Sequence, residues 1–110
     1  MDKKKMLNTY YNYPLADGST VKMTMNFFYL LQLKNKDKSL YERYNKVFAK
    51  QSSKNAEYDE LDNMLILYTA YCCANLSDEN LMSEEDFLMM CGSDRKAMGE
   101  ALKALLAPKN

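Results

Sequence analysis

The chain has 110 residues, of which 47% are hydrophobic and 27% charged, with only three Gly and two Pro. This composition excludes disordered and collagen-like chains, and the length suits one domain because domains cluster near roughly 100 to 150 residues. We therefore expect a single, mainly α domain over residues 1–110. An extended segment or β-hairpin over residues 1–24 should precede a small bundle of four to five helices over residues 25–107, arranged around a buried central helix.

Missing residue types exclude several kinds of chemistry. There is no His, which removes the commonest general base and the commonest metal ligand. The three Cys are an odd number, and Cys72 and Cys73 are neighbours in an apolar stretch, which is typical of cytosolic Cys used as small apolar side chains. No catalytic motif stands out. We expect a protein that is not an enzyme and that needs no cofactor and no metal.

The start of the chain is basic, but no apolar stretch follows it, and no apolar run of 18 residues occurs later. We therefore expect no export signal, no membrane contact and a cytoplasmic location.

Charge is distributed unevenly although the formal net charge is zero. Residues 1–55 carry +7 and residues 56–110 carry −7. Two differently solvated faces of one domain are the favoured explanation, and stacked subunits or a charged partner are alternatives. Nucleic-acid binding is disfavoured, because the Lys residues are scattered through helical pattern with Asp37 and Glu42 among them.

Residues 10–25 have the pattern of a β-hairpin. Tyr-rich sequence precedes Asp17 and Gly18, a pair that tolerates the positive φ of a tight turn, and β-branched residues follow it. Because Pro14 cannot donate to a ladder, its strand should lie at an edge or turn its amide side to solvent. A lone hairpin is marginal in water, so it should pack on the helices or on another chain.

Five later segments have helical spacing of apolar residues. Their expected ranges are about 27–35, 39–50, 56–76, 84–91 and 94–107. The segment 61–76 is apolar on nearly every side, which is typical of a helix buried among several neighbours. We expect it to be the central helix of the bundle.

Several helix ends carry capping signals. The stretch 39–42 reads as a capping box, in which the Ser hydroxyl accepts an amide and the Glu carboxylate reaches back. Ser83 offers a second N-terminal cap, and Gly92 suits the end of that helix. The last helix should begin at Ser93 or Asp94.

The acidic stretch 75–86 has oxygen-bearing side chains at a spacing similar to that of a calcium-binding loop. It has Asn80 where such loops need Gly and Asp86 where they need a bidentate Glu, so an acidic loop before a capped helix is favoured. The adjacent carboxylates of Glu84, Glu85 and Asp86 are explained better by capping and the helix dipole than by acid–base catalysis.

Nine Met are more than packing alone requires. Met fills gaps in cores, which is the favoured interpretation, but it also makes surfaces that accept varied apolar helices. We predict that a partner binds to a surface formed by Met89, Met90, Met98 and Leu102. A second patch is predicted at Phe28 and Tyr29.

Four stretches form a set with a resemblance to a known family. They are residues 25–34 (MNFFYLLQLK), 40–46 (LYERYNK), 65–75 (LILYTAYCCAN) and 82–87 (MSEEDF). Together they resemble the tail assembly chaperones of siphophages and prophages of Gram-positive bacteria. The resemblance covers about residues 16–91, and the Tyr-rich and Lys-rich residues 1–15 depart from it.

This resemblance implies a small helical protein that is made in the infected cell and is absent from the finished virion. Such proteins are thought to cover the long tape measure protein, keep it soluble and recruit the major tail protein, and a longer frameshifted form often accompanies them. Self-association stays open. The alternatives are a small regulator that binds nucleic acid through the basic half and, less favoured, an enzyme that uses the acidic loop and a metal.

Overall fold

The computed structural model describes residues 10–51, 60–92 and 94–106. This part is mainly helical, with a two-stranded hairpin before five helices, as the sequence predicts. The start expected for the central helix, at residues 56–59, lies outside the described residues. The elements are β1 (Tyr11–Pro14), β2 (Thr20–Met23), α2 (Phe27–Lys36), α3 (Lys38–Gln51), α4 (Glu60–Ala74), α5 (Glu84–Cys91) and α6 (Arg95–Leu106).

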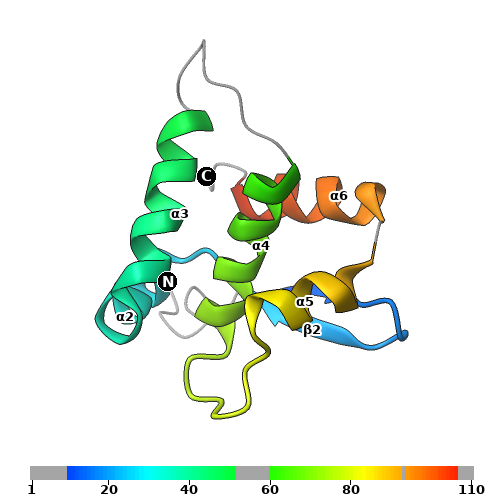
Figure 1. The fold of residues 1–110 in the computed structure, drawn as a ribbon, viewed down its shortest axis with the longest axis horizontal. Coiled ribbons are helices and arrows are strands. Elements are labelled where there is room, and N and C mark those ends of the chain that lie inside the picture. Colours follow the sequence, from blue (N-terminus) through cyan, green and yellow to red (C-terminus); the bar gives the residue numbers. More distant parts are fainter. Residues whose placement is uncertain (1–9, 52–59, 93, 107–110) are drawn as a thin grey trace, which may run out of the picture.

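Helix α4 is the central helix. It runs through the middle of the molecule (Figure 1) and packs against β2, α2, α3, α5 and α6. The side chains of Ile66, Leu67, Thr69 and Ala70 are 0% exposed. Thr69 is polar, but its hydroxyl donates to the carbonyl oxygen of Leu65 at 2.8 Å, so burial leaves no unpaired group. The predicted central position of this segment is confirmed.

The hairpin is antiparallel and turns where the sequence predicts. Tyr13 pairs with Val21, and Gly18 adopts a φ of 90°, a conformation that Gly takes without steric cost. The Asp17 carboxylate accepts the amide of Ser19 at 2.9 Å and fixes the turn. Pro14 is exposed and is the last residue of β1, where a missing donor costs little.

One face of the hairpin is buried against the helices. The side chains of Tyr13 and Met23 are 1% and 0% exposed. Backbone hydrogen bonds also join the hairpin region to two helices: the amide of Thr24 donates to Ala70 of α4 at 3.1 Å, and that of Ala16 donates to Met90 of α5 at 2.7 Å. The helices therefore supply the packing that an isolated hairpin lacks.

Asp37 alone connects α2 to α3. Its amide donates to the carbonyl oxygen of Leu33 at 2.6 Å and closes α2, while its carboxylate accepts the amide of Leu40 at 3.1 Å and begins α3. The predicted cap at Ser39 is therefore wrong, because α3 starts one residue earlier, at Lys38. One residue satisfies unpaired backbone groups of both helices.

The caps of the last two helices agree with prediction. The Ser83 hydroxyl accepts the amide of Asp86 at 3.2 Å. Gly92 ends α5 with a φ of 65°, and the Asp94 carboxylate accepts the amide of Ala97 at 3.0 Å before α6 begins. Ser93, the alternative start, lies outside the described residues.

Candidate functional site: two apolar grooves

Large apolar side chains are exposed on several helices. Among the described residues they are Phe27 (88% exposed), Met89 (77%), Leu61 (66%), Leu31 (58%), Phe28 (42%) and Phe48 (41%). Exposed apolar side chains that gather in one place mark binding surfaces. Four of the six border one of two grooves.

The first groove, called the α2–α3 groove, lies in the corner between these two helices and has a volume of about 280 Å³. Its lining residues are Phe27, Leu30, Leu31, Lys34, Tyr41, Tyr44, Asn45 and Phe48. Leu30 and Tyr44 are only 5% and 6% exposed, so part of the lining belongs to the core. The Lys34 ammonium lies 5.5 Å from the centre of the Tyr41 ring, a distance that permits a cation–π contact.

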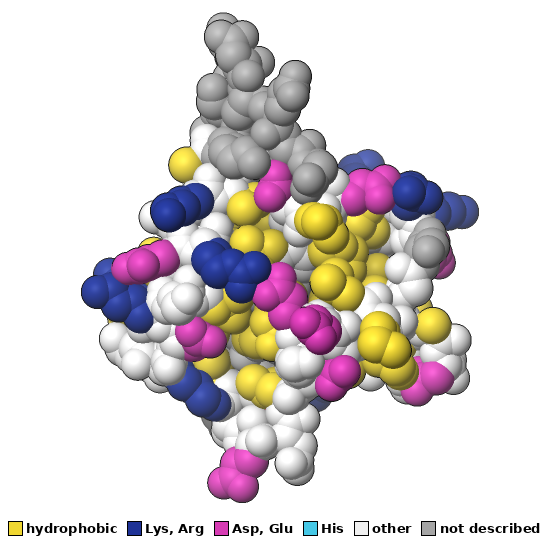
Figure 2. All heavy atoms as spheres, viewed as in Figure 1, with side chains coloured by type: hydrophobic (Ala, Val, Ile, Leu, Met, Phe, Trp, Pro, Cys, Tyr) yellow, Lys and Arg dark blue, Asp and Glu magenta, His cyan; other side chains and the backbone are white. Residues whose placement is uncertain are grey.

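The second groove, called the α4–α6 groove, has a volume of about 240 Å³. Its lining residues are Tyr13, Glu60, Leu61, Met64, Leu88, Cys91, Gly92, Asp94, Arg95 and Met98. Figure 2 shows apolar side chains gathered over the region between α4, α5 and α6, with acidic side chains near them.

An ion pair crosses the rim of the α4–α6 groove. The Arg95 guanidinium donates two hydrogen bonds to the Glu60 carboxylate, one of them 3.0 Å long. This hydrogen bonding lowers the pKa of Glu60. Both groups are well exposed, so the pair adds little stability and orders the rim instead.

The two grooves differ in charge. Lys34 lines the α2–α3 groove, and helix α2 carries no Asp or Glu. The α4–α6 groove is lined by Glu60, Asp94 and Arg95, so acids outnumber bases there. Each groove therefore reflects the charge of the half of the chain that builds most of it.

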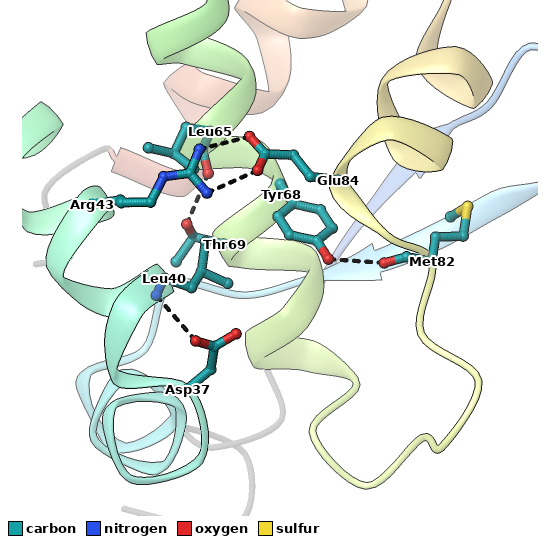
Figure 3. A network of polar contacts seen from close by, with 8 residues as sticks. All are labelled: Asp37, Leu40, Arg43, Leu65, Tyr68, Thr69, Met82 and Glu84. Carbon is teal, nitrogen blue, oxygen red and sulfur yellow. Dashed lines mark hydrogen bonds and ion pairs between the residues drawn. The ribbon is translucent and has the colours of Figure 1, made fainter.

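One ion pair joins the two halves of the chain. Arg43 of α3 donates to both carboxylate oxygens of Glu84 at 2.8 and 3.0 Å, reaching across α4 to the first turn of α5 (Figure 3). The hydrogen bond to Glu84 raises the pKa of Arg43 further above its usual value. Part of the charge asymmetry is therefore satisfied inside the fold.

Two Tyr hydroxyls hold the loop between α4 and α5. Tyr68 donates to the carbonyl oxygen of Met82 at 2.8 Å (Figure 3), and the hydroxyl of Tyr71 accepts the amide of Met82 at 3.0 Å. Phe87 stacks on Tyr71 with ring centres 5.3 Å apart. These contacts hold the end of the loop against α4. No group of three or more metal-ligating residues is found in the part of the chain that the structure describes.

The three thiols are buried and free, which confirms their predicted place in the core. Burial raises the pKa of Cys72 to about 11, that of Cys73 to about 12 and that of Cys91 to about 11. Since the thiolate is the reactive form, all three are weak nucleophiles at neutral pH.

The structure does not bring the predicted partner-binding residues together in one surface. Met98 lines the α4–α6 groove, and Met89 is 77% exposed on α5 and follows Leu88, which lines the same groove. Met90 and Leu102 are partly buried against the core. Their part in binding stays a prediction.

The second predicted patch lies on α2. Phe28 is 42% exposed and stacks on the half-buried Tyr29 with ring centres 5.3 Å apart. Neither side chain lines the groove, which uses Phe27 and Leu31 of the same helix instead. Apolar residues cover α2 on nearly every side. A helix at the edge of the bundle cannot bury all of its sides, so this pattern was a signal that some apolar side chains of α2 would be exposed.

No described helix combines the length and the apolar character needed to cross a bilayer. The chain matches no model of a known protein family, no curated protein and no solved structure.

Proposed function

We propose that this protein is a non-catalytic tail assembly chaperone of a phage or prophage. It binds the tape measure protein, keeps it soluble and recruits the major tail protein during assembly of the tail. It acts in the cytoplasm of the bacterial host and is absent from the finished virion.

The observation that carries this proposal is the exposure of large apolar side chains beside preformed grooves. Phe27 and Leu31 are 88% and 58% exposed on a helix whose opposite side is in the core. Apolar surface of this kind favours association, since water is released when a partner covers it. A long helical client with apolar stripes is a partner that such surface suits.

Two further features support a chaperone. Both grooves are small, so each contact is expected to be weak, and repeated contacts along one long client gain affinity by avidity. The resemblance of residues 16–91 to tail assembly chaperones points to the same class of client.

Co-expression with the tape measure protein of the same phage tests the proposal. We expect the chaperone to raise the soluble yield of the tape measure protein and to copurify with it. A Phe27→Gln/Leu31→Gln/Leu61→Gln variant, which alters both grooves, should lose most of this effect. Gln32→Ala is the matched control, because Gln32 is exposed on α2 and lines neither groove.

The proposal fails if the soluble yield is unchanged by the wild-type chain. Retention on DNA that falls steeply as salt rises, with no effect on the tape measure protein, would instead support a nucleic-acid-binding regulator.

A further inference from the structure

We propose that the α2–α3 groove binds a single amphipathic helix of the partner, whose apolar side chains recur at i, i+3 or i+4, and i+7 and are flanked by Asp or Glu. This inference rests on the proposed chaperone function and names the site and the sequence chemistry of the client.

The groove is held in place before a partner arrives. Asp37 closes α2 and begins α3, so the corner between the two helices is fixed by hydrogen bonds at 2.6 and 3.1 Å. Leu30 and Tyr44 anchor the two helices in the core. A preformed site does not have to be ordered on binding, which favours affinity.

The length of the groove suits a partner helix. Its volume of about 280 Å³ has room for apolar side chains of such a helix. Tyr41 and Phe48 are two helical turns apart, about 10 Å along α3. Residues i and i+7 of a partner helix span the same distance, so three anchors fit along the groove.

The groove wall includes aromatic side chains and an exposed Leu. Phe27, Tyr41 and Phe48 supply aromatic surface, and Leu31 is 58% exposed between the helices. Aromatic anchors bury much area at a small cost in conformational entropy.

The positive charge near the α2–α3 groove favours a partner helix with acidic residues beside its apolar anchors. Lys34 lines the groove, and Lys46 follows the lining residue Asn45. The nearby carboxylates are engaged: Glu42 lies 3.9 Å from Lys38, and Asp37 caps α3. An Asp or Glu beside the apolar anchors would therefore meet Lys, and a Lys would be repelled.

Two synthetic helical peptides test this inference. Both carry the same Leu stripe at i, i+4 and i+7, and they differ only in having Glu or Lys at the flanking positions. Fluorescence anisotropy at low salt should show the Glu-flanked peptide binding about tenfold or more tightly than the Lys-flanked one, with the difference shrinking as salt screens the charges. Amide shifts on binding should fall within residues 27–48.

Substitutions assign the binding to this groove. Leu31→Gln should weaken binding of the Glu-flanked peptide about tenfold or more, as expected for a central anchor. Leu61→Gln makes the same change in the α4–α6 groove and should leave the affinity unchanged. Lys34→Glu/Lys46→Glu should reverse the preference between the peptides. Circular dichroism checks that each variant is folded, which their exposure favours.

The inference is overturned if both peptides bind equally, if neither binds, or if the amide shifts map to the α4–α6 groove. It is also overturned if a DNA oligonucleotide produces the same shifts and binds Leu31→Gln as tightly as the wild type. In each case the co-expression assay reports separately on the chaperone function, which stands if the tape measure protein is still solubilised.

Discussion

Helices α2 and α4 look alike in sequence and differ in what they do. Both carry apolar residues on nearly every side. Helix α4 is enclosed by five other elements, whereas only Leu30 and Leu33 of α2 are buried. The remaining apolar side chains of α2, such as Phe27 and Leu31, face solvent or the α2–α3 groove.

An apolar helix can be enclosed in the core or left partly exposed, and its neighbours decide which. In α4 the apolar side chains hold the fold together, because burial of each removes its surface from water within one chain. In α2 only Leu30 and Leu33 are buried, so its exposed apolar side chains contribute less to the fold. Substitutions should therefore affect stability at α4 and binding at α2.

The strongest test places the same charge on both helices. Ile66→Asp puts a carboxylate where the native side chain is 0% exposed, so the variant should lose more than about 4 kcal/mol and be largely unfolded at room temperature. Leu31→Asp is the matched control at a 58% exposed position, and its free energy of unfolding should change by less than about 1 kcal/mol.

Urea unfolding followed by circular dichroism measures both values. Equal destabilisation of the two variants would mean that α2 is as much a part of the core as α4, and the distinction between the helices would be lost.

Alkaline pH tests the burial of the core, to which α4 contributes Cys72 and Cys73, without a substitution. Burial raises the pKa of Cys72 to about 11 and that of Cys73 to about 12, from an ordinary 9.0. A raised folded-state pKa means that stability is full below the unfolded pKa and is lost as pH rises through the folded one. The free energy of unfolding should stay constant up to about pH 8.5 and fall between about pH 9 and 12.

Urea titrations at increasing pH measure this loss. Cys73→Ala should show a shallower fall, because one of the titrating groups is removed. Rapid reaction of native Cys73 with a thiol reagent at pH 7.5 would contradict the burial on which this expectation rests.

Parts of the fold could be predicted from the sequence because local and global signals agree there. The Asp17 and Gly18 pair specifies a hairpin turn by its backbone preferences alone. The long apolar stretch of α4 indicated a central helix, and Ser83 and Asp94 indicated two helix starts, because a capping side chain acts within three residues.

Other parts depended on tertiary position and could not be predicted. The Ser39 cap was wrong because Asp37 satisfies the ends of two helices at once, and the capping-box pattern describes only one of them. The groove between α2 and α3 was not predicted, since periodicity identifies a helix but does not say which neighbours it has.

The corner between α2 and α3 depends on a single capping residue. Asp37→Ala removes the side chain that begins α3, and we expect a loss of about 1 kcal/mol, the usual cost of losing an N-cap. Ser39→Ala is the control and should change stability by less than about 0.5 kcal/mol, because Ser39 is exposed inside the first turn. If the two losses are reversed, the capping box is correct and Asp37 is not the cap. Asp37→Ala should also weaken binding of the Glu-flanked peptide, because the groove is no longer fixed at its corner.

The smallest expected effect concerns the ion pair that links α3 to α5 across α4. Arg43 and Glu84 form two hydrogen bonds, but their side chains are 51% and 33% exposed, so solvent screens the pair. A double-mutant cycle with Arg43→Gln and Glu84→Gln should give a coupling free energy of about 0.2–1 kcal/mol, and added salt should reduce it. The cycle is needed because Glu84 also lies in the first turn of α5, where its charge favours the helix by itself. A coupling that is absent at low salt would mean that the basic and acidic halves of the chain are not tied together by this pair, and that the charge asymmetry is left for a partner to satisfy.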